Sequence, residues 1–174
     1  MEVTIVVNLK AKPFNLTDED IKWVEATIAD MTIEEKIGQL FVNMGASREE
    51  EYLKDMLNTY HIGAVRYNPA TAEQVYDQNK ILQENSKIPL LIAANTEAGG
   101  NGACVNGTYV ASQVKIGATN DPKYAYEMGR VSGVEAAAIG CNWSFAPVVD
   151  IDMNWRNPVI SSRCYSNKAE QVLE

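Results

Sequence analysis

The stretch Ile88-Pro89-Leu90-Leu91-Ile92-Ala93-Ala94 decides the fold of this chain. It is apolar throughout and lacks the alternation of a strand that has one face in water. Such a run is typical of a parallel strand that is covered on both faces. We therefore predict a strand at Leu90–Ala94 in the interior of a parallel sheet.

Three further stretches on either side of this strand have the same short apolar character. Helical patterns separate them, for instance at Arg48–Tyr60, and the apolar segments never follow one another through a tight turn. This alternation is typical of parallel β/α units joined by right-handed crossovers. The predicted strands, adjacent in sequence order with the helices packed outside, are Leu40–Met44, Ala64–Tyr67, Leu90–Ala94 and Asn142–Ala146.

Helix starts are marked by capping signals. Thr17 and Thr32 each stand three residues before an acidic residue, and Thr71 stands three residues before Gln74, which is the pattern of a capping box. Asp121 precedes a proline that suits a first helical turn, and Gly140 ends the helix that follows. The chain thus divides into an N-terminal extension, residues 1–17, with a short alternating strand at residues 3–9, and one domain at residues 18–174.

The C-terminus starts a helix that the chain does not complete. Asn167 and Glu170 resemble a helix start, and only four residues follow. Because an isolated helix needs about 12–15 residues to be stable, we expect a domain cut just after its fourth strand. The alternative is a complete small sheet with a frayed tail.

The charge and cysteine content exclude several classes of function. The 174 residues carry 15 Lys and Arg against 23 Asp and Glu, a net charge of −8, so no basic field exists for nucleic acid or anionic lipid. No apolar run approaches the roughly 18–20 residues of a membrane span, and no signal-peptide core is present, so we expect a cytoplasmic protein. The three widely spaced cysteines predict reduced, structural thiols.

Several residue patterns are weak candidates for chemistry. The only histidine, His61, lies at the entrance of the second strand, the wrong end for catalysis in parallel β/α folds, so Ser-His-Asp and Cys-His catalysis are excluded. The Gly-rich loop at residues 97–102 matches no phosphate-loop spacing, which disfavours a nucleotide-binding domain. Asp150 and Asp152 could hold a divalent cation, but we favour loop carboxylates bonded to backbone. We expect no metal and no cofactor.

Polar side chains follow the third and fourth strands at the point where each strand ends. Because the carboxyl ends of parallel strands meet at one edge, we expect these side chains to converge on one rim. Carboxylates, amides, a guanidinium and aromatic faces are the groups that bind sugar hydroxyls and stack on pyranose rings. The alternative is a polar loop surface with the tryptophans in the core. The residues concerned are Asn95, Thr96, Glu97, Asp150, Asp152, Asn154 and Arg163, with Trp143 and Trp155 nearby.

The order of four motifs resembles the N-terminal barrel domain of glycoside hydrolase family three. The motifs lie at Met31–Phe41, Ile88–Gly100, Phe145–Asp150 and Asn157–Arg163, and the resemblance runs from about Asp18 to the end. It implies a TIM-type (β/α)8 barrel of which the chain supplies about the first four strands. In the family, a retaining mechanism uses an aspartate nucleophile and a separate proton donor, and both lie beyond the position matching Glu174.

The resemblance assigns substrate-binding roles and no catalytic residue to this chain. Arg163 matches the family arginine that hydrogen-bonds the non-reducing sugar, Asp150 the aspartate that ends the fourth strand, and Glu97 the glutamate of the strand-three motif. Asn95 departs from the family, because many members have an aspartate there that binds sugar hydroxyls, and Ala98 replaces a common glycine. The arginine motif resembles the β-N-acetylhexosaminidase branch more than the β-glucosidase branch.

Two classes of function remain open from the sequence. The first is the N-terminal part of a retaining exo-glycosidase that removes a terminal β-linked N-acetylglucosamine or glucose, with the isolated chain inactive. The second is a non-catalytic sugar-binding or interaction module on a half-barrel. Because a cut barrel leaves open strand edges and uncovered apolar side chains, we also expect self-association or a loosely packed monomer.

Overall fold

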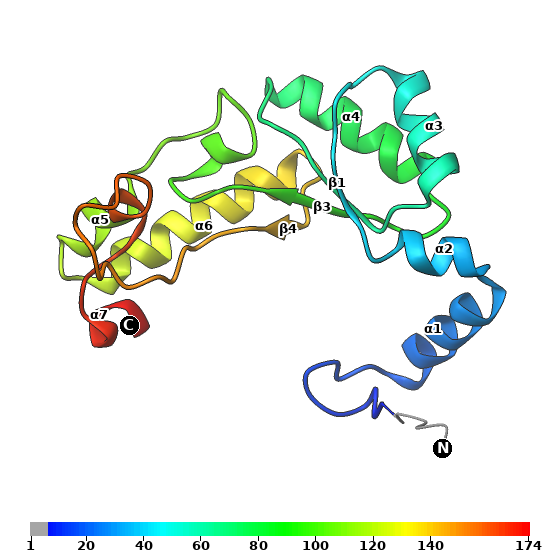
Figure 1. The fold of residues 1–174 in the computed structure, drawn as a ribbon, viewed down its shortest axis with the longest axis horizontal. Coiled ribbons are helices and arrows are strands. Elements are labelled where there is room, and N and C mark those ends of the chain that lie inside the picture. Colours follow the sequence, from blue (N-terminus) through cyan, green and yellow to red (C-terminus); the bar gives the residue numbers. More distant parts are fainter. Residues whose placement is uncertain (1–6) are drawn as a thin grey trace.

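The computed structural model describes residues 7–174 and consists of β/α units arranged in a row (Figure 1). The four strands form one parallel sheet in sequence order, which confirms the predicted topology. The strands are β1 (Val42–Met44), β2 (Ala64–Arg66), β3 (Leu91–Ala94) and β4 (Trp143–Ser144). The α-helices are α1 (Asp18–Asp30), α2 (Ile33–Gly38), α3 (Glu50–Tyr60), α4 (Ala72–Asn85), α5 (Gln113–Gly117), α6 (Pro122–Ala138) and α7 (Ala169–Leu173), and the short 3-10 helices are η1 (Gly100–Gly102) and η2 (Ser161–Arg163).

The predicted capping residues start the helices as expected. Thr17, Thr32 and Thr71 each complete a reciprocal capping box with the side chain three residues later. The Asp121 carboxylate accepts a hydrogen bond from a backbone N–H in the first turn of α6. Gly140 follows the end of that helix with a φ of 83°, a left-handed conformation that glycine adopts without a Cβ penalty.

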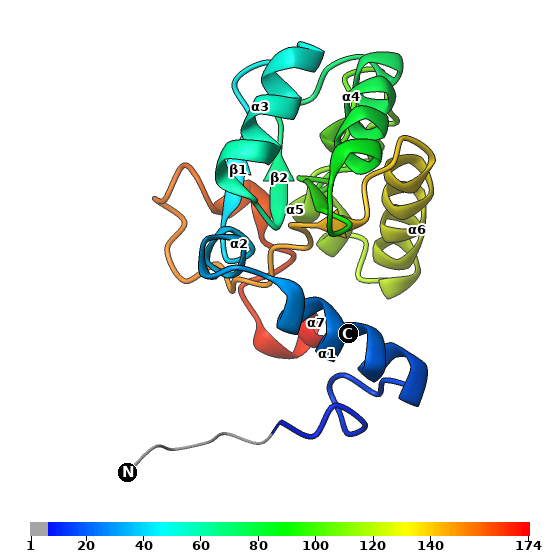
Figure 2. The ribbon, with the colours of Figure 1, turned by 90° about the vertical axis from the view of Figure 1, so that its right-hand side faces the viewer.

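One face of the sheet is buried under helices. Side chains of β2 and β3 that point to this face, such as Val65 and Ile92, are almost completely buried together with Leu53 and Met56 of α3 and Leu82 of α4. Figure 2 shows α3, α4 and α6 arranged in sequence around the outside of the strands. This side holds the hydrophobic core.

The opposite face of the sheet is open within residues 7–174. Val42, Met44 and Leu91 point to this face and are 43%, 57% and 50% exposed. The prediction that the parallel strands are covered on both faces is therefore wrong for this face. The physical reason is curvature, because in a barrel the inner face of one strand is covered by strands on the far side of the ring.

The N-terminal segment extends away from the sheet. Most of the strand predicted at residues 3–9 lies outside the described residues, and residues 7–9 are coil and turn. Helix α1 contains no buried residue and projects from the body of the molecule (Figure 1). Lys87 links this segment to the sheet region, since its Nζ lies 3.1 Å from a carboxylate oxygen of Asp30 and 3.0 Å from one of Glu35.

The C-terminal segment packs beside α5, a helix that the sequence pattern did not predict. Helix α7 begins two residues after the predicted start at Asn167, and its Gln171 side chain donates a hydrogen bond of 2.9 Å to the carbonyl of Gly117. Figure 1 shows α5 and α7 together at the end of the molecule opposite α1. Five-residue helices such as these are too short for a clear periodic pattern.

The three cysteines are free and buried, in agreement with the predicted structural thiols. Burial raises the pKa of the Cys104 and Cys141 thiols above the usual cysteine value, so both are held protonated at neutral pH. Within the described part of the chain, no helix combines the length and apolar character that a membrane crossing requires.

Candidate functional site

The carboxyl ends of the strands form a rim that is held in place by the hydroxyl groups of three residues. Thr96 follows β3 and is almost completely buried, and its Oγ lies 2.8 Å from Oγ of Ser144 at the end of β4. Ser132 of α6 donates a hydrogen bond of 3.1 Å to the carbonyl of Thr96. The segment that carries Asn95 and Glu97 is therefore held between β4 and α6.

Glu97 and Arg163 form a two-pronged ion pair on this rim. Arg163 donates from Nε and from Nη2 to the two carboxylate oxygens of Glu97, each at 2.7 Å. The two residues are 66 positions apart, and their side chains are 21% and 39% exposed, respectively. The hydrogen bonds that Arg163 donates to Glu97, followed by the negative charges of Glu97 and Asp150, raise the pKa of Arg163. The pair fixes the plane of the guanidinium group.

Asn95 accepts a hydrogen bond from a second arginine on the same rim. Arg66, the last residue of β2, donates from Nε to Oδ1 of Asn95 at 3.3 Å and from Nη1 to Oδ1 of Asn68 at 2.8 Å. Arg66 is in register with Ala93 of β3, which is in register with Trp143 of β4, so the three side chains belong to one row on the open face. Asn95 thus contacts Arg66 and stands two residues before Glu97, the partner of Arg163.

The two aspartates after β4 have different surroundings. Asp150 is exposed, and its charge contributes to the raised pKa of Arg163, which places it in the neighbourhood of that side chain. Asp152 is half-buried, and its backbone N–H donates to the carbonyl of Ser166 at 3.0 Å. In the described residues 7–174, no group of three or more His, Cys, Asp and Glu side chains is placed to hold a metal ion.

The tryptophans near the rim do not belong to the core. Trp143 is 38% exposed and lies edge-on to Phe145, with the ring centroids 4.7 Å apart. Trp155 is 75% exposed and carries the guanidinium of Arg156 at 4.3 Å from its ring centroid. Both rings are available to stack on a flat ligand surface.

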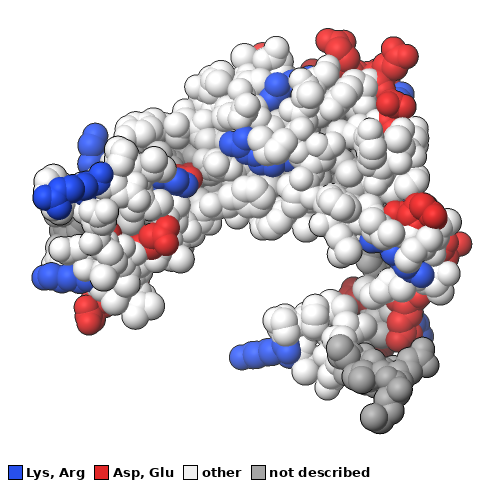
Figure 3. All heavy atoms as spheres, viewed as in Figure 1, with Lys and Arg blue, Asp and Glu red and all other residues white. Residues whose placement is uncertain are grey.

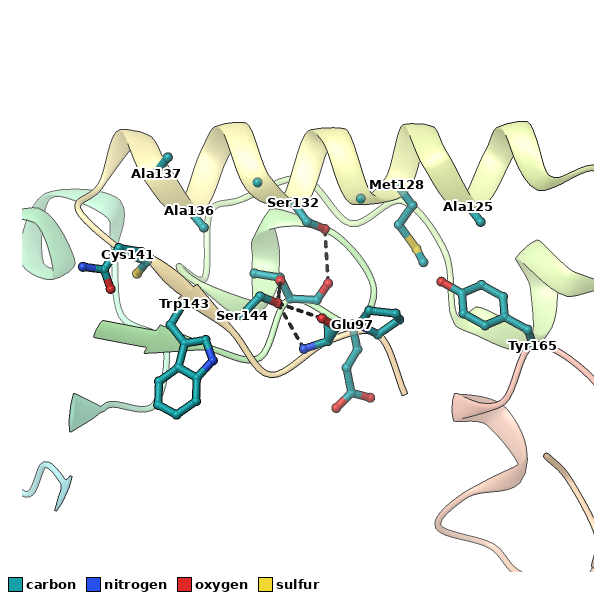
Figure 4. Close-up of a pocket in the computed structure, with 16 residues that line it drawn as sticks. Glu97, Ala125, Met128, Ser132, Ala136, Ala137, Cys141, Trp143, Ser144 and Tyr165 are labelled. Atoms are coloured by element: carbon teal, nitrogen blue, oxygen red, sulfur yellow. Dashed lines mark hydrogen bonds between the residues drawn. The ribbon is translucent and has the colours of Figure 1, made fainter. Parts of the chain in front are cut away.

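A cavity of about 410 Å³ lies between the rim and α6 (Figure 4). The α6 side of the cavity is lined by small residues, among them Gly129, Gly133 and Ala136. Glu97 and Trp143 also line the cavity, while Figure 4 shows the carboxylate of Glu97 and the ring of Trp143 pointing to the side away from α6.

His61 lies at the other end of the strands, as the sequence predicted. It ends α3 in a left-handed conformation with a φ of 50°, and its carbonyl accepts a hydrogen bond of 2.8 Å from Nε2 of Gln39. This position stabilises a helix end and is remote from the rim.

The structure thus places each predicted site residue on the rim and adds others. Glu97 and Arg163 contact each other, Asn95 lies two residues before Glu97, and Asp150 lies close enough to act on Arg163 by charge. Sequence reasoning missed Arg66 and its partner Asn68. The available signal was a charged residue at the carboxyl end of an otherwise apolar strand, where parallel β/α folds place functional groups.

Comparisons with known proteins agree with this architecture. The family model described as "Glycosyl hydrolase family 3 N terminal domain" matches residues 32–174. The chain is 38% identical over 167 residues to a beta-N-acetylglucosaminidase/beta-glucosidase of Cellulomonas fimi, which covers 96% of this chain and 30% of that protein.

Solved structures of similar sequence share the fold. A structure of the beta-glucoside phosphorylase BglX with bound 2FGlc superposes with a TM-score of 0.87 at 39% identity, covering 95% of this chain and 30% of that one. A family 3 beta-N-acetylglucosaminidase from Paenibacillus sp. superposes with a TM-score of 0.72 at 32% identity, covering 82% of this chain and 29% of that one. The chain therefore spans less than a third of the length of these relatives.

Proposed function

This chain belongs to glycosyl hydrolase family 3, whose N-terminal domain it matches, and from that premise we propose that it supplies the sugar-binding part of a glycosidase. The proposed enzyme is retaining and exo-acting, and it removes a terminal β-linked N-acetylglucosamine or glucose. The names of the Cellulomonas fimi and Paenibacillus relatives support these two sugars. Residues Asn95, Asp150 and Arg163 bind the sugar, and the nucleophile and proton donor lie outside residues 1–174.

The observation that carries this proposal is the Glu97–Arg163 ion pair. Glu97 binds the Nε and Nη2 edge of the guanidinium, whereas Nη1 donates to no acceptor among residues 7–174. A guanidinium held in one plane with free N–H groups presents fixed donors to adjacent hydroxyls. Arg163 is therefore suited to hold a sugar, and Glu97 is suited to hold Arg163.

The same contact occupies both carboxylate oxygens of Glu97, so neither is free to exchange a proton with a substrate. Glycosidase chemistry also needs two carboxyl groups on opposite sides of the anomeric carbon. The glycosidic C1–O bond breaks, the leaving oxygen takes a proton and water supplies the new oxygen on C1. We assign these steps to residues outside this chain.

A chimera tests the proposal directly. Residues 1–174 replace the matching part of the Cellulomonas fimi relative, and kcat/KM is measured on nitrophenyl β-N-acetylglucosaminide and β-glucoside. Arg163→Lys and Arg163→Ala should both lower kcat/KM by about one to two orders of magnitude, because each lost charge-assisted hydrogen bond costs about 1.5–3 kcal/mol. Arg130→Lys is the matched control, since Arg130 pairs with Glu127 on the exposed side of α6 and should leave kcat/KM unchanged.

Two results would contradict the assignment. An Arg163→Lys chimera within about twofold of the unmodified chimera would place Arg163 outside the sugar site. Turnover by the isolated 174-residue chain, above a heat-denatured control and abolished by Asp150→Asn, would make Asp150 catalytic. A chimera that binds both sugars in calorimetry but never turns them over would instead favour a non-catalytic sugar-binding module.

Phosphate in place of water is a second candidate acceptor. The observation in its favour is the similarity to beta-glucoside phosphorylase BglX, at 39% identity over 95% of this chain. In that reaction the C1–O bond breaks, a phosphate oxygen bonds to C1, and the leaving oxygen takes the proton. Product analysis of the chimera with and without inorganic phosphate separates the two, because only phosphorolysis yields a sugar 1-phosphate.

A further inference from the structure

Two arginines that the glycosidase proposal does not use meet at Asn68. Arg66 donates from Nη1 to the side-chain oxygen of Asn68, and Arg48 donates from Nη2 to the backbone carbonyl of the same residue. Arg48 precedes α3 and Arg66 ends β2, so both come from the carboxyl ends of neighbouring strand units. Two positive charges are thereby held beside one asparagine.

No acidic side chain of residues 7–174 forms an ion pair with either of these arginines. Among residues 7–174, the ion pairs within 4.0 Å include Arg163 and Arg130 but neither Arg48 nor Arg66. Glu50, close to Arg48 in the sequence, is bound by Lys54 at 2.5 Å. The acceptors of Arg66 are the amide oxygens of two asparagines and the sulfur of Met44, and all three are neutral.

Both guanidinium groups are held in place and retain free donors. The Arg48 group lies over the Tyr67 ring, 5.2 Å from its centroid, and its Nε is buried without a hydrogen-bond partner among the described residues. Arg66 is held through Nε and Nη1, while its Nη2 donates to no described residue. A buried donor without a partner carries a desolvation cost that a bound acceptor would remove.

Arg66 lies on the open face of the sheet beside the rim, and Arg48 reaches it through their shared contact with Asn68. Arg66 shares its row with Ala93 and Trp143, and it contacts Asn95 directly. Figure 3 shows Lys and Arg atoms over the middle of the molecule, where the strands run in Figure 1, while Asp and Glu atoms gather around α3 and α2. A negatively charged ligand on the open face thus approaches Arg66 from the side away from these acidic groups.

Asn95 is the residue that keeps Arg66 unpaired. Its Oδ1 lies 3.3 Å from Nε of Arg66, which is the position a carboxylate oxygen would take if the residue were an aspartate. An aspartate would form an ion pair with Arg66, as Glu97 does with Arg163. The asparagine instead orients the guanidinium and leaves its charge available.

We propose that Arg48 and Arg66 form a binding site for a phosphate group on this face. A phosphate near neutral pH carries close to two negative charges and several acceptor oxygens, which matches two guanidinium groups better than a carboxylate does. The inference extends the proposed function, because a phosphate here would lie beside the sugar site. Binding is measured without turnover, so its failure is distinguishable from failure of the glycosidase proposal.

The experiment is a titration of the 174-residue chain with inorganic phosphate, followed by the NMR signals of the arginine Nε–H groups at constant ionic strength. The signals of Arg48 and Arg66 should shift, while that of Arg130 should not. Arg66→Gln should weaken binding about tenfold or more, and Asn95→Asp should weaken it to a similar degree. Arg66→Lys should retain part of the affinity, and Arg130→Gln should bind as the unmodified chain does.

Titrations with two further ligands, glucose 6-phosphate and acetate, identify the source of the phosphate group. Tighter binding of glucose 6-phosphate than of inorganic phosphate supports the site and assigns it to a phosphate ester on a sugar, and the reverse order assigns it to free phosphate. The proposal is overturned if acetate binds as tightly as phosphate. It is also overturned if neither arginine signal shifts at about 20 mM phosphate, because two charged donors should bind phosphate more tightly than that. Unchanged affinity in a folded Arg66→Gln variant, with folding checked by circular dichroism, also overturns it.

Discussion

The centre and the edges of the sheet have similar sequences and opposite environments. In the centre, Val65 of β2 and Ile92 of β3 are at most 2% exposed beneath α3 and α4. At the edges, Val42 of β1 is 43% exposed and Trp143 of β4 is 38% exposed. All four side chains belong to short apolar strands. An apolar side chain is buried only where neighbouring elements cover the face to which it points, and Leu91 of the central strand β3, which points to the open face, is 50% exposed. The covered face at the centre of the sheet therefore carries the apolar packing, and the open face and the edges do not.

The attachment of the edges to the centre is correspondingly polar. Asn142, just before β4, accepts a hydrogen bond from the backbone of Ile92 at 2.7 Å and donates one to the carbonyl of Leu90 at 2.9 Å. The Tyr67 hydroxyl, just after β2, donates to the carbonyl of Ser47 in the loop after β1 at 3.0 Å. These hydrogen bonds hold the edge strands to the centre of the sheet, where the edges have little apolar packing.

The largest expected difference between centre and edge comes from removing a leucine at each. Leu82→Ala, in α4 over the centre of the sheet, should lower the free energy of unfolding by about 2–5 kcal/mol, because it leaves a cavity in a fully buried position. Leu40→Ala, at an 83% exposed position before β1, should change it by less than about 0.5 kcal/mol. Urea unfolding followed by circular dichroism measures both.

The comparison between centre and edge fails if the two leucines behave alike. Equal losses would mean that Leu40 is covered in solution, for instance by a second copy of the chain. Repeating the unfolding at several protein concentrations separates that case, because only an associated edge gives a concentration-dependent midpoint.

Removing the polar attachment of β4 should have the next largest effect. Asn142→Ala loses two hydrogen bonds to β3 and should cost roughly 1–2 kcal/mol, at about 0.5–1.5 kcal/mol per bond. Asn85→Ala is the control, since that side chain bonds only within its own helix, to the carbonyl of Ile81. Amide hydrogen exchange should show faster exchange of the β3 backbone in Asn142→Ala. An unchanged exchange rate at Ile92 would contradict the attachment role.

Tyr67 should give a smaller effect with a distinct pH dependence. Burial raises the pKa of Tyr67 to about 12 from 10.0, so the neutral phenol is favoured in the folded state. Its contribution to stability is complete below pH 10, is lost as the pH rises from about 10 to about 12 and does not change further above that. Tyr67→Phe loses the hydrogen bond to Ser47, about 0.5–1.5 kcal/mol at pH 7, and should lack this alkaline decline. Urea unfolding between pH 8 and pH 12 measures both effects, and an identical alkaline decline in the phenylalanine variant would rule Tyr67 out as its source.

A substitution on the edge strand β1 should give the smallest change in stability and a clear change in self-association. The unmodified chain should self-associate as its concentration rises, because within residues 7–174 β1 pairs only with β2 and carries exposed apolar residues. Val42→Lys places a charge on this strand and should shift the population toward monomer in sedimentation velocity, with less than about 0.5 kcal/mol change in unfolding free energy. A compact monomer at all concentrations that binds no hydrophobic dye would contradict this expectation.

Most of the fold follows from local signals in the sequence. The capping boxes at Thr17, Thr32 and Thr71 and the apolar run at Leu90–Ala94 located helices and a strand within a few residues of their observed bounds. The errors occur where local signals are weak. Helix α5 was missed because it has only five residues, and β4 is two residues long although the apolar pattern around it is longer.

The candidate site was located from the sequence as a region, but its contacts were not. Parallel strand order alone brings Asn95, Glu97 and Arg163 to one rim. Glu97 and Arg163, which bind each other, are 66 residues apart in the sequence. Arg66 and Asn95 are 29 residues apart. No local pattern encodes such a pairing. The sequence could therefore nominate Glu97 and Arg163 together as sugar ligands, whereas the structure assigns them to each other first.

The sequence by itself determined most of the elements, the parallel order of the strands and the family, because capping, periodicity and short motifs act over a few residues. The tertiary structure decided which charges are neutralised. Arg163 has a carboxylate partner and Arg66 has two asparagines and a second arginine nearby, although both lie at the carboxyl ends of the same sheet. Electrostatic compensation depends on distances of a few ångströms between residues far apart in the chain, and only the curvature and register of the sheet set those distances.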